Sequence, residues 1–159
     1  MRNLQEAIRL REQGKLEESR KLLLDLVEQL PASGEVHYQC AWIHDNLGLE
    51  RDAAVYYEKA LVLNLSSEDA KGAFIGLGST YRTIGEYSKS KETLLKGIEK
   101  FPENNIMKVF LSMTLYNLGE HAEAMEHLLT SLVATSHDEE VLKYKKAIGF
   151  YAPRLDETW

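Results

Sequence analysis

Residues 74–97 read FIGLGSTYRTIGEYSKSKETLLKG, and Gly85 near the centre of this stretch is the residue from which the fold is predicted. Apolar residues recur every three or four positions on both sides of it, as they do in amphipathic helices. A glycine between two helical patterns favours a sharp turn, because glycine adopts a left-handed backbone without strain. The stretch therefore predicts two helices joined at Gly85.

The same arrangement occurs four times along the chain. The turn glycines are 34, 37 and 34 residues apart, and they are Gly14, Gly48, Gly85 and Gly119. A small residue follows each glycine at the fifth position, and these are Ser19, Ala53, Ser90 and Ala124. A large residue stands four positions further on, and in the four copies it is Leu23, Tyr57, Leu94 and Leu128. This spacing places both residues on one helix face, so four helix-turn-helix repeats are predicted.

The third copy carries a resemblance to a known repeat family. Its residues at signature spacings are Phe74, Leu77-Gly78, Tyr81, Gly85-Glu86-Tyr87, Ser90, Leu94, Gly97 and Pro102. Together with the period near 34, they resemble the tetratricopeptide repeat (TPR) family, with serine and leucine replacing the usual alanine and aromatic residue. The first copy is the most degenerate in its opening helix. The resemblance covers roughly residues 1–136 and implies an all-α fold, an α-α superhelix or TPR solenoid of four repeats.

The resemblance also implies a domain organisation. We expect one solenoid over residues 1–149 and a tail over residues 150–159. The repeats are expected at about residues 1–33, 34–66, 70–103 and 104–136. The spacing of 37 indicates a three-residue insertion near Ser66-Ser67-Glu68-Asp69, which is expected to lengthen the connection into the third repeat.

A capping helix is predicted after the fourth repeat. Ser136-His137-Asp138-Glu139 matches a capping box, which indicates a helix over residues 138–149. Its apolar stripe would cover the end of the last repeat, and it consists of Val141, Tyr144, Ala147 and Ile148. The tail is then expected to leave the helix.

Composition limits the classes of function. The chain has 159 residues, 44% of them hydrophobic, and a formal charge of -6 with acidic and basic residues interspersed. A nucleic-acid partner is therefore not expected, because phosphate binding needs clustered Lys and Arg. Apolar stretches are too short for a membrane span. The single cysteine, Cys40, and a start without an apolar signal segment predict a cytoplasmic location.

The resemblance places the working surface on the concave face, which the first helix of each repeat lines. The positions carried over from the family are Leu4, Ile8, Arg11, Tyr38, Gln39, Trp42, Asp45, Ile75, Gly76, Ser79, Arg82, Val109, Phe110, Met113, Tyr116 and Asn117. Trp, Tyr, Phe, Met and Arg are enriched at the centres of protein interfaces. An extended peptide or amphipathic helix with bulky apolar side chains would suit this groove. Alternatively, a register shifted by one position would make some of these side chains core.

One subgroup of the family binds a terminal carboxylate with a cluster of Lys, Asn and Arg. The equivalent positions here hold Tyr38, Trp42, Gly72 and Gly76, so that cluster is absent. Arg82 alone could pair with an acidic group, although a single arginine is more often solvated.

One helix offers a lead for metal or thiol chemistry. His37, Cys40 and His44 share a face at i, i+3 and i+7, a spacing that could supply metal ligands or a thiolate. The repeat alignment instead places all three against the partner helix, and core packing is the preferred reading. The sequence therefore predicts no enzyme, no metal and no cofactor.

Two hypotheses of function remain. The first is an adaptor or scaffold that binds a peptide or helix of another protein, with Tyr38, Trp42, Phe110, Met113 and Tyr116 as anchors. The second is a self-assembly module whose aromatic tail docks into its own groove or a neighbour's. That tail carries Tyr151, Leu155 and Trp159.

Overall fold

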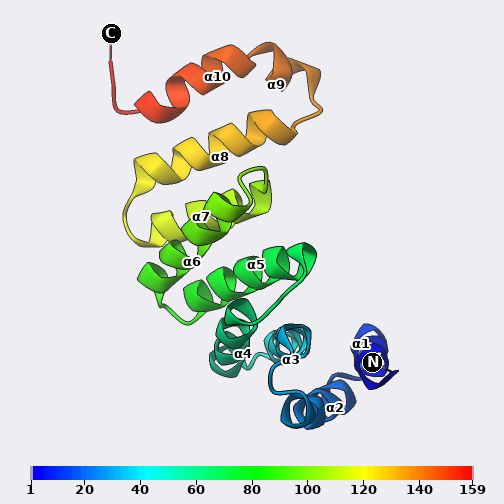
Figure 1. Ribbon diagram of the computed structural model, residues 1–159. Coiled ribbons are helices and arrows are strands. Elements are labelled where there is room, and N and C mark those ends of the chain that lie inside the picture. Colours follow the sequence, from blue (N-terminus) through cyan, green and yellow to red (C-terminus); the bar gives the residue numbers. More distant parts are fainter. Residues whose placement is uncertain (1, 159) are drawn as a thin grey trace. The chain divides into compact units, whose positions relative to one another are not determined.

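The computed structural model describes residues 2–158, and its regular elements over that range are all helical. The chain forms two compact units, of which the first ends at Gly85 and the second begins at Glu86. The first contains α1 (Arg2–Glu12), α2 (Leu16–Gln29), α3 (Gly34–Asn46), α4 (Glu50–Val62) and α5 (Ser67–Thr83). The second contains α6 (Tyr87–Lys100), α7 (Asn105–Asn117), α8 (His121–Thr135), α9 (Glu139–Lys143), α10 (Lys145–Tyr151) and the 3-10 helix η1 (Ala152–Arg154) (Figure 1).

The predicted turns at the four repeated glycines are confirmed. Their φ angles are left-handed, with values of 76° at Gly14, 71° at Gly48, 82° at Gly85 and 78° at Gly119. At the first turn, the Lys15 N–H donates to the Leu10 carbonyl at 2.9 Å, which satisfies a carbonyl at the end of α1. Each glycine thus stops one helix and lets the next begin within a few residues.

In the first unit, α3 contributes residues to two separate core clusters. One core cluster joins α3 to α1 and α2 and contains Leu4, Ala7, Leu23, Leu26, Val36, Cys40 and Ile43. The other joins α3 to α4 and α5 and contains Tyr38, Ala41, Ala53, Ala54, Tyr57, Ala60, Ala73, Leu77 and Tyr81. Sequential helices pack together, and α3 also contacts α1 and α5. The first helices of successive hairpins are therefore neighbours in this unit.

The repeated stripe on the second helices is buried in three copies. Leu23, Tyr57 and Leu94 are at most 3% exposed, whereas Leu128 on α8 is 38% exposed. The elements that follow α8 and pack on it are short, namely α10 and η1. They leave this part of the α8 surface uncovered.

The inserted residues lie inside a helix, which differs from the expected longer connection. α5 has 17 residues, while α3 and α7 have 13 each. Ser66 caps α5, because its Oγ accepts the Asp69 N–H at 3.0 Å. The insertion therefore extends α5 at its N-terminal end.

The segment after α8 also differs from the single helix predicted over residues 138–149. It is divided into α9 and α10 at Tyr144, whose φ of −96° and ψ of 7° leave the helical region. The N-cap is Asp138 rather than Ser136, since its Oδ1 accepts the N–H groups of Glu140 and Val141 at 2.9 and 3.1 Å. In the predicted stripe, Val141 and Ile148 are half-buried, but Tyr144 and Ala147 are exposed.

The beginning of the predicted tail is helical. α10 continues to Tyr151, and Ala152 in η1 is 3% exposed because η1 packs against α8. Tyr151 and Leu155 are each about half exposed. The third residue named for the tail, Trp159, lies outside the described residues.

Candidate functional site

Trp42 is the large side chain that α3 presents to solvent. It is 40% exposed, although its chain neighbours Ala41 and Ile43 are fully buried. The Tyr38 ring, one turn earlier, lies 5.8 Å from the Trp42 ring between centroids. Trp42 also contacts Arg11, whose Cζ lies 3.8 Å from the centroid of the indole ring. The indole is therefore held in one orientation by two neighbours.

Arg11 is buried at the end of α1 and reaches across to α3. Only 9% of the residue is exposed, and its Nη1 donates to the Gln39 Oε1 at 2.6 Å. Burial lowers the pKa of Arg11, while the nearby Tyr38 and Glu12 act against this shift. Guanidinium groups stack favourably on indole rings. We call Arg11, Tyr38, Gln39 and Trp42 the Arg11 cluster.

Two glycines on α5 make room for two tyrosines. A Cβ added at Gly72 would lie 2.8 Å from the Cζ of Tyr38, and one added at Gly76 would lie 2.7 Å from the Cε1 of Tyr57. Both distances are below real Cβ contacts, so each ring occupies the space of a missing side chain. The sequence pattern marked both glycines as positions without clamp residues and Gly76 also as a groove position. Their packing role depends on the positions of α3 and α4 relative to α5.

Asp45 is engaged within the first unit. Its Oδ2 accepts the Tyr57 hydroxyl at 2.9 Å, and its Oδ1 accepts the Thr80 hydroxyl at 2.9 Å. These bonds join α3 to α4 and α5. Burial raises the pKa of the Asp45 carboxyl, and the two hydrogen bonds act against this shift. Asp45 therefore serves the packing of the unit.

The other predicted residues of the first unit vary in burial. Leu4 belongs to the core, and Ile8 on α1 is half-buried. On α5, Ile75, Ser79 and Arg82 are half-buried. The Ser79 hydroxyl donates to the Gly76 carbonyl at 2.9 Å. Of the predicted anchors in this unit, Trp42 exposes the most aromatic surface.

The remaining predicted residues lie on α7 in the second unit. Val109, Phe110 and Met113 are half-buried, while Tyr116 is 66% exposed and Asn117 is also exposed. Val109, Met113 and Tyr116 follow at i, i+4 and i+7, which places them along one face of the helix. The Tyr116 ring lies 5.0 Å from the ring of His121. This face is separate from the buried Leu111 and Leu115.

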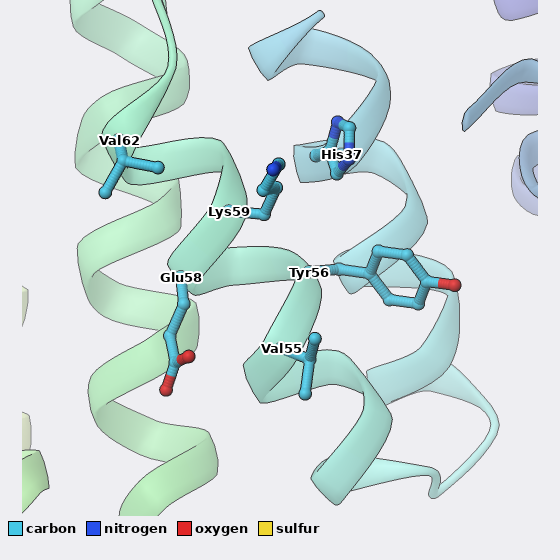
Figure 2. A pocket seen from close by; sticks show the side chains of 6 residues that line it. All are labelled: His37, Val55, Tyr56, Glu58, Lys59 and Val62. Atoms are coloured by element: carbon cyan, nitrogen blue, oxygen red, sulfur yellow. The ribbon is translucent and has the colours of Figure 1, made fainter. Parts of the chain in front are cut away.

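A pocket that sequence reasoning missed lies on α3 and α4. Its volume is about 470 Å³, and Figure 2 shows its lining, with one residue from α3 and the rest from α4. The lining residues are His37, Val55, Tyr56, Glu58, Lys59 and Val62. The sequence contained one signal, because Val55 and Val62 are apolar residues at i and i+7 and so share one face of α4. In the structure they are 62% and 80% exposed.

The His37, Cys40 and His44 face is part of the packed interior. The Nδ1 of His44 lies 2.6 Å from the Cys40 carbonyl, and the Nδ1 of His37 lies 2.8 Å from the Ser33 carbonyl. Carbonyls only accept, so both Nδ1 atoms carry the proton in these bonds. Burial raises the pKa of the Cys40 thiol to about 12, which keeps it protonated at neutral pH. These contacts explain the three residues as core.

Residues 2–158 hold no cluster of three or more His, Cys, Asp or Glu side chains placed to bind a metal ion. Within the same range, none of the helices has the length and apolar character needed to cross a bilayer.

These hairpins define the class of the protein as an α-helical repeat protein. The family model described as tetratrico peptide repeat matches residues 34–155, which is more than half of the chain. The chain therefore belongs to the tetratricopeptide repeat family. The match begins at the second repeat, so the most degenerate copy lies outside it. Membership supports a role in protein–protein interaction.

Solved structures confirm the fold. A crystal structure of MamA matches with a TM-score of 0.75 and 19% identity, over 91% of this chain and 74% of that one. PilF of Pseudomonas aeruginosa matches with a TM-score of 0.70 and 19% identity, over 97% and 71%. YrrB, described as a TPR protein with an unusual peptide-binding site, matches with a TM-score of 0.67 and 15% identity, over 98% and 86%. No curated protein matches the chain.

Proposed function

We propose that this protein is a non-enzymatic adaptor that binds a peptide or helix of a partner protein on the first helices of its hairpins. The observation that carries the proposal is Trp42, which is 40% exposed yet fixed by Arg11 and Tyr38. An exposed indole that is already immobilised loses little entropy on binding. Such aromatic residues dominate the energetics of protein interfaces.

The second unit supports the same proposal with an apolar face. Val109, Met113 and Tyr116 follow one side of α7, and Phe110 lies next to them. A partner segment with bulky apolar side chains would bury these residues. We place this activity in the cytoplasm, where the single cysteine has no need of a disulfide partner.

A pull-down from host lysate tests the proposal. Wild type is compared with Trp42→Ala plus Phe110→Ala, and the double variant is expected to lose partners that the wild type retains. The matched control is Val55→Ala plus Val62→Ala, which removes exposed apolar side chains of α4 that are not among the predicted groove residues. Circular dichroism checks that each variant is folded. Identical partner lists for the wild type and the first variant would refute the groove assignment.

The C-terminal elements support a second candidate, which is self-assembly. Tyr144, Phe150, Tyr151 and Leu155 are each about half exposed, and they lie in or next to α10 and η1. Exposed apolar surface of this kind is often an interaction site. In this hypothesis, the C-terminal tail docks into its own groove or into the groove of a neighbouring copy.

Light scattering distinguishes the two candidates. Because Ala152 is buried, point changes are preferable to truncation, and Tyr151→Ser plus Leu155→Ser removes two of the four exposed apolar side chains. Self-assembly predicts an oligomeric wild type and a smaller variant. If both are monomers across the concentration range, assembly through this surface is ruled out.

A further inference from the structure

We propose that the Arg11 cluster binds the carboxylate of an aspartate or glutamate side chain, presented by a partner segment between apolar residues. This inference rests on the proposed function, because it specifies the chemistry of the segment that the groove of the first unit accepts. It assigns to Arg11 the recognition of charge and to Trp42 the contact with the neighbouring apolar side chain.

The guanidinium of Arg11 contacts no acidic side chain among the described residues, although Glu12 lies near enough to act on its pKa. Its Nη1 bonds to the neutral amide of Gln39, and no ion pair within 4.0 Å involves it. Asp45, a groove carboxylate, is occupied by the hydroxyls of Tyr57 and Thr80. A buried charge without a counter-ion is costly, and an incoming carboxylate would relieve that cost.

The other donors of Arg11 are not fully enclosed by the protein. A guanidinium carries several N–H groups, and among the described residues only Nη1 of Arg11 has a protein acceptor. Across residues 2–158, the fully enclosed side-chain polar atom that lacks a partner is the Ser131 Oγ. The free N–H groups of Arg11 are therefore not sealed inside the protein. They offer a forked donor edge to a ligand in the groove.

The surroundings of Arg11 make this edge selective for a carboxylate. With 9% of the residue exposed, little water competes for the guanidinium, and charge-assisted hydrogen bonds strengthen when they are shielded from water. The stack on Trp42 and the bond to Gln39 fix the plane of the group. A planar, oriented guanidinium matches the two oxygens of a carboxylate.

The position of Arg11 favours a side-chain carboxylate over a chain terminus. Groove positions continue on either side of it, with Ile8 one turn earlier on α1 and Asp45 one turn after Trp42 on α3. Capture of a terminus uses several converging donors. The positions where the family's tail-binding subgroup supplies them hold Tyr38, Trp42, Gly72 and Gly76 here, and the rings of Tyr38 and Tyr57 lie against the two glycines.

Peptide arrays test the inference. The probes are acetylated, amidated 12-residue peptides with Glu or Gln fixed at the centre and Leu, Ile, Phe, Ala or Ser elsewhere. A third set has central Gln and a free C-terminal carboxylate, and a fourth contains only Gly and Ser. Full-length wild type is compared with Arg11→Gln and Arg11→Lys, and Arg9→Gln is the control because Arg9 is exposed and paired with Glu6.

Wild type and Arg9→Gln are expected to retain the Glu set about tenfold better than the Gln set, the effect of one charged hydrogen-bonded pair. Arg11→Gln should abolish this preference. Arg11→Lys should reduce it, because an ammonium keeps the charge without the planar fork. Circular dichroism verifies folding. If Arg11→Gln is unfolded, the inference is tested by comparing the preference for the Glu set between wild type and Arg11→Lys.

The remaining outcomes overturn the inference in distinguishable ways. Equal retention of the Glu and Gln sets, both above the Gly and Ser set, refutes it while leaving the proposed function intact. A preference that persists in Arg11→Gln, or that is full in Arg11→Lys, also refutes it. Stronger retention of the free-terminus set assigns the site to a chain end instead. If none of the apolar peptide sets is retained better than the Gly and Ser set, both proposals are refuted.

Discussion

The hydroxyl of Tyr57 on α4 donates to the Oδ2 of Asp45 on α3 at 2.9 Å. The same carboxylate accepts the hydroxyl of Thr80 on α5 at 2.9 Å. One acid therefore links three helices that are consecutive in the first unit. Its two hydroxyl donors satisfy a group that is otherwise expensive to bury.

Replacing Tyr57 with Phe removes one of these bonds and keeps the ring. We expect Tyr57→Phe to lower the free energy of unfolding by about 1–3 kcal/mol, since a buried hydrogen bond to a charged group is lost. Urea unfolding followed by circular dichroism measures the change. Tyr116→Phe is the control, because Tyr116 is 66% exposed. Equal effects of the two changes would show that the Asp45 bond contributes nothing specific.

The stability of the protein should depend on pH through Asp45. Burial raises the pKa of this carboxyl above its ordinary value of 3.8, so the folded state favours the protonated form. The resulting contribution to the free energy of unfolding is complete below pH 3.8. It is lost as the pH rises through the pKa that Asp45 has in the folded protein. Asparagine at this position does not titrate.

The unfolding free energy of Asp45→Asn relative to wild type should therefore increase as the pH rises from 3.5 to 7. Urea titrations of both proteins at matched ionic strength measure this difference. A difference that is constant or that shrinks with pH would contradict a raised pKa. The comparison cancels the titration of all other groups that the two proteins share.

The turns were predictable from sequence because their signal is local. A left-handed residue at Gly14, Gly48, Gly85 and Gly119 restricts the choice to glycine almost regardless of the surroundings. The buried stripe beside them was predictable for the same reason, since helix periodicity places Ser19 and Leu23 on one face. The equivalent residue on α8, Leu128, is not buried. Its exposure depends on how much of α8 the last helices cover, and helix periodicity carries no information about that.

The state of the groove residues was not predictable from local pattern. Arg11 is a predicted groove residue, but the sequence pattern does not reveal its bond to Gln39, 28 residues later, or its contact with Trp42. Likewise, Gly72 and Gly76 are predicted only as clamp or groove positions, and the rings of Tyr38 and Tyr57 against them are seen only in the structure. These contacts join residues far apart in sequence, so they follow only from the packing of hairpins.

Adding a methyl group at Gly76 should destabilise the first unit. Alanine is the better helix former by about 1 kcal/mol, but the new Cβ would overlap the Tyr57 ring. Overpacking typically costs roughly 1–3 kcal/mol, so we expect a net loss of stability for Gly76→Ala. Gly149→Ala is the matched control, because a Cβ there meets nothing within 4 Å, and it should be neutral or stabilising. Stabilisation by both changes, measured by thermal unfolding, would contradict the packing role.

The Cys40 thiol should be inert in the folded protein. It is fully buried, and burial raises its pKa to about 12, so the reactive thiolate is scarce between pH 7 and 9. We expect no reaction with Ellman's reagent on the timescale of minutes in buffer, and one thiol per chain released in 6 M guanidinium chloride. Reaction of the native protein at a rate near that of the unfolded chain would show that α3 opens readily. A slow native reaction that accelerates in Tyr57→Phe would instead connect thiol exposure to the bond between α3 and α4.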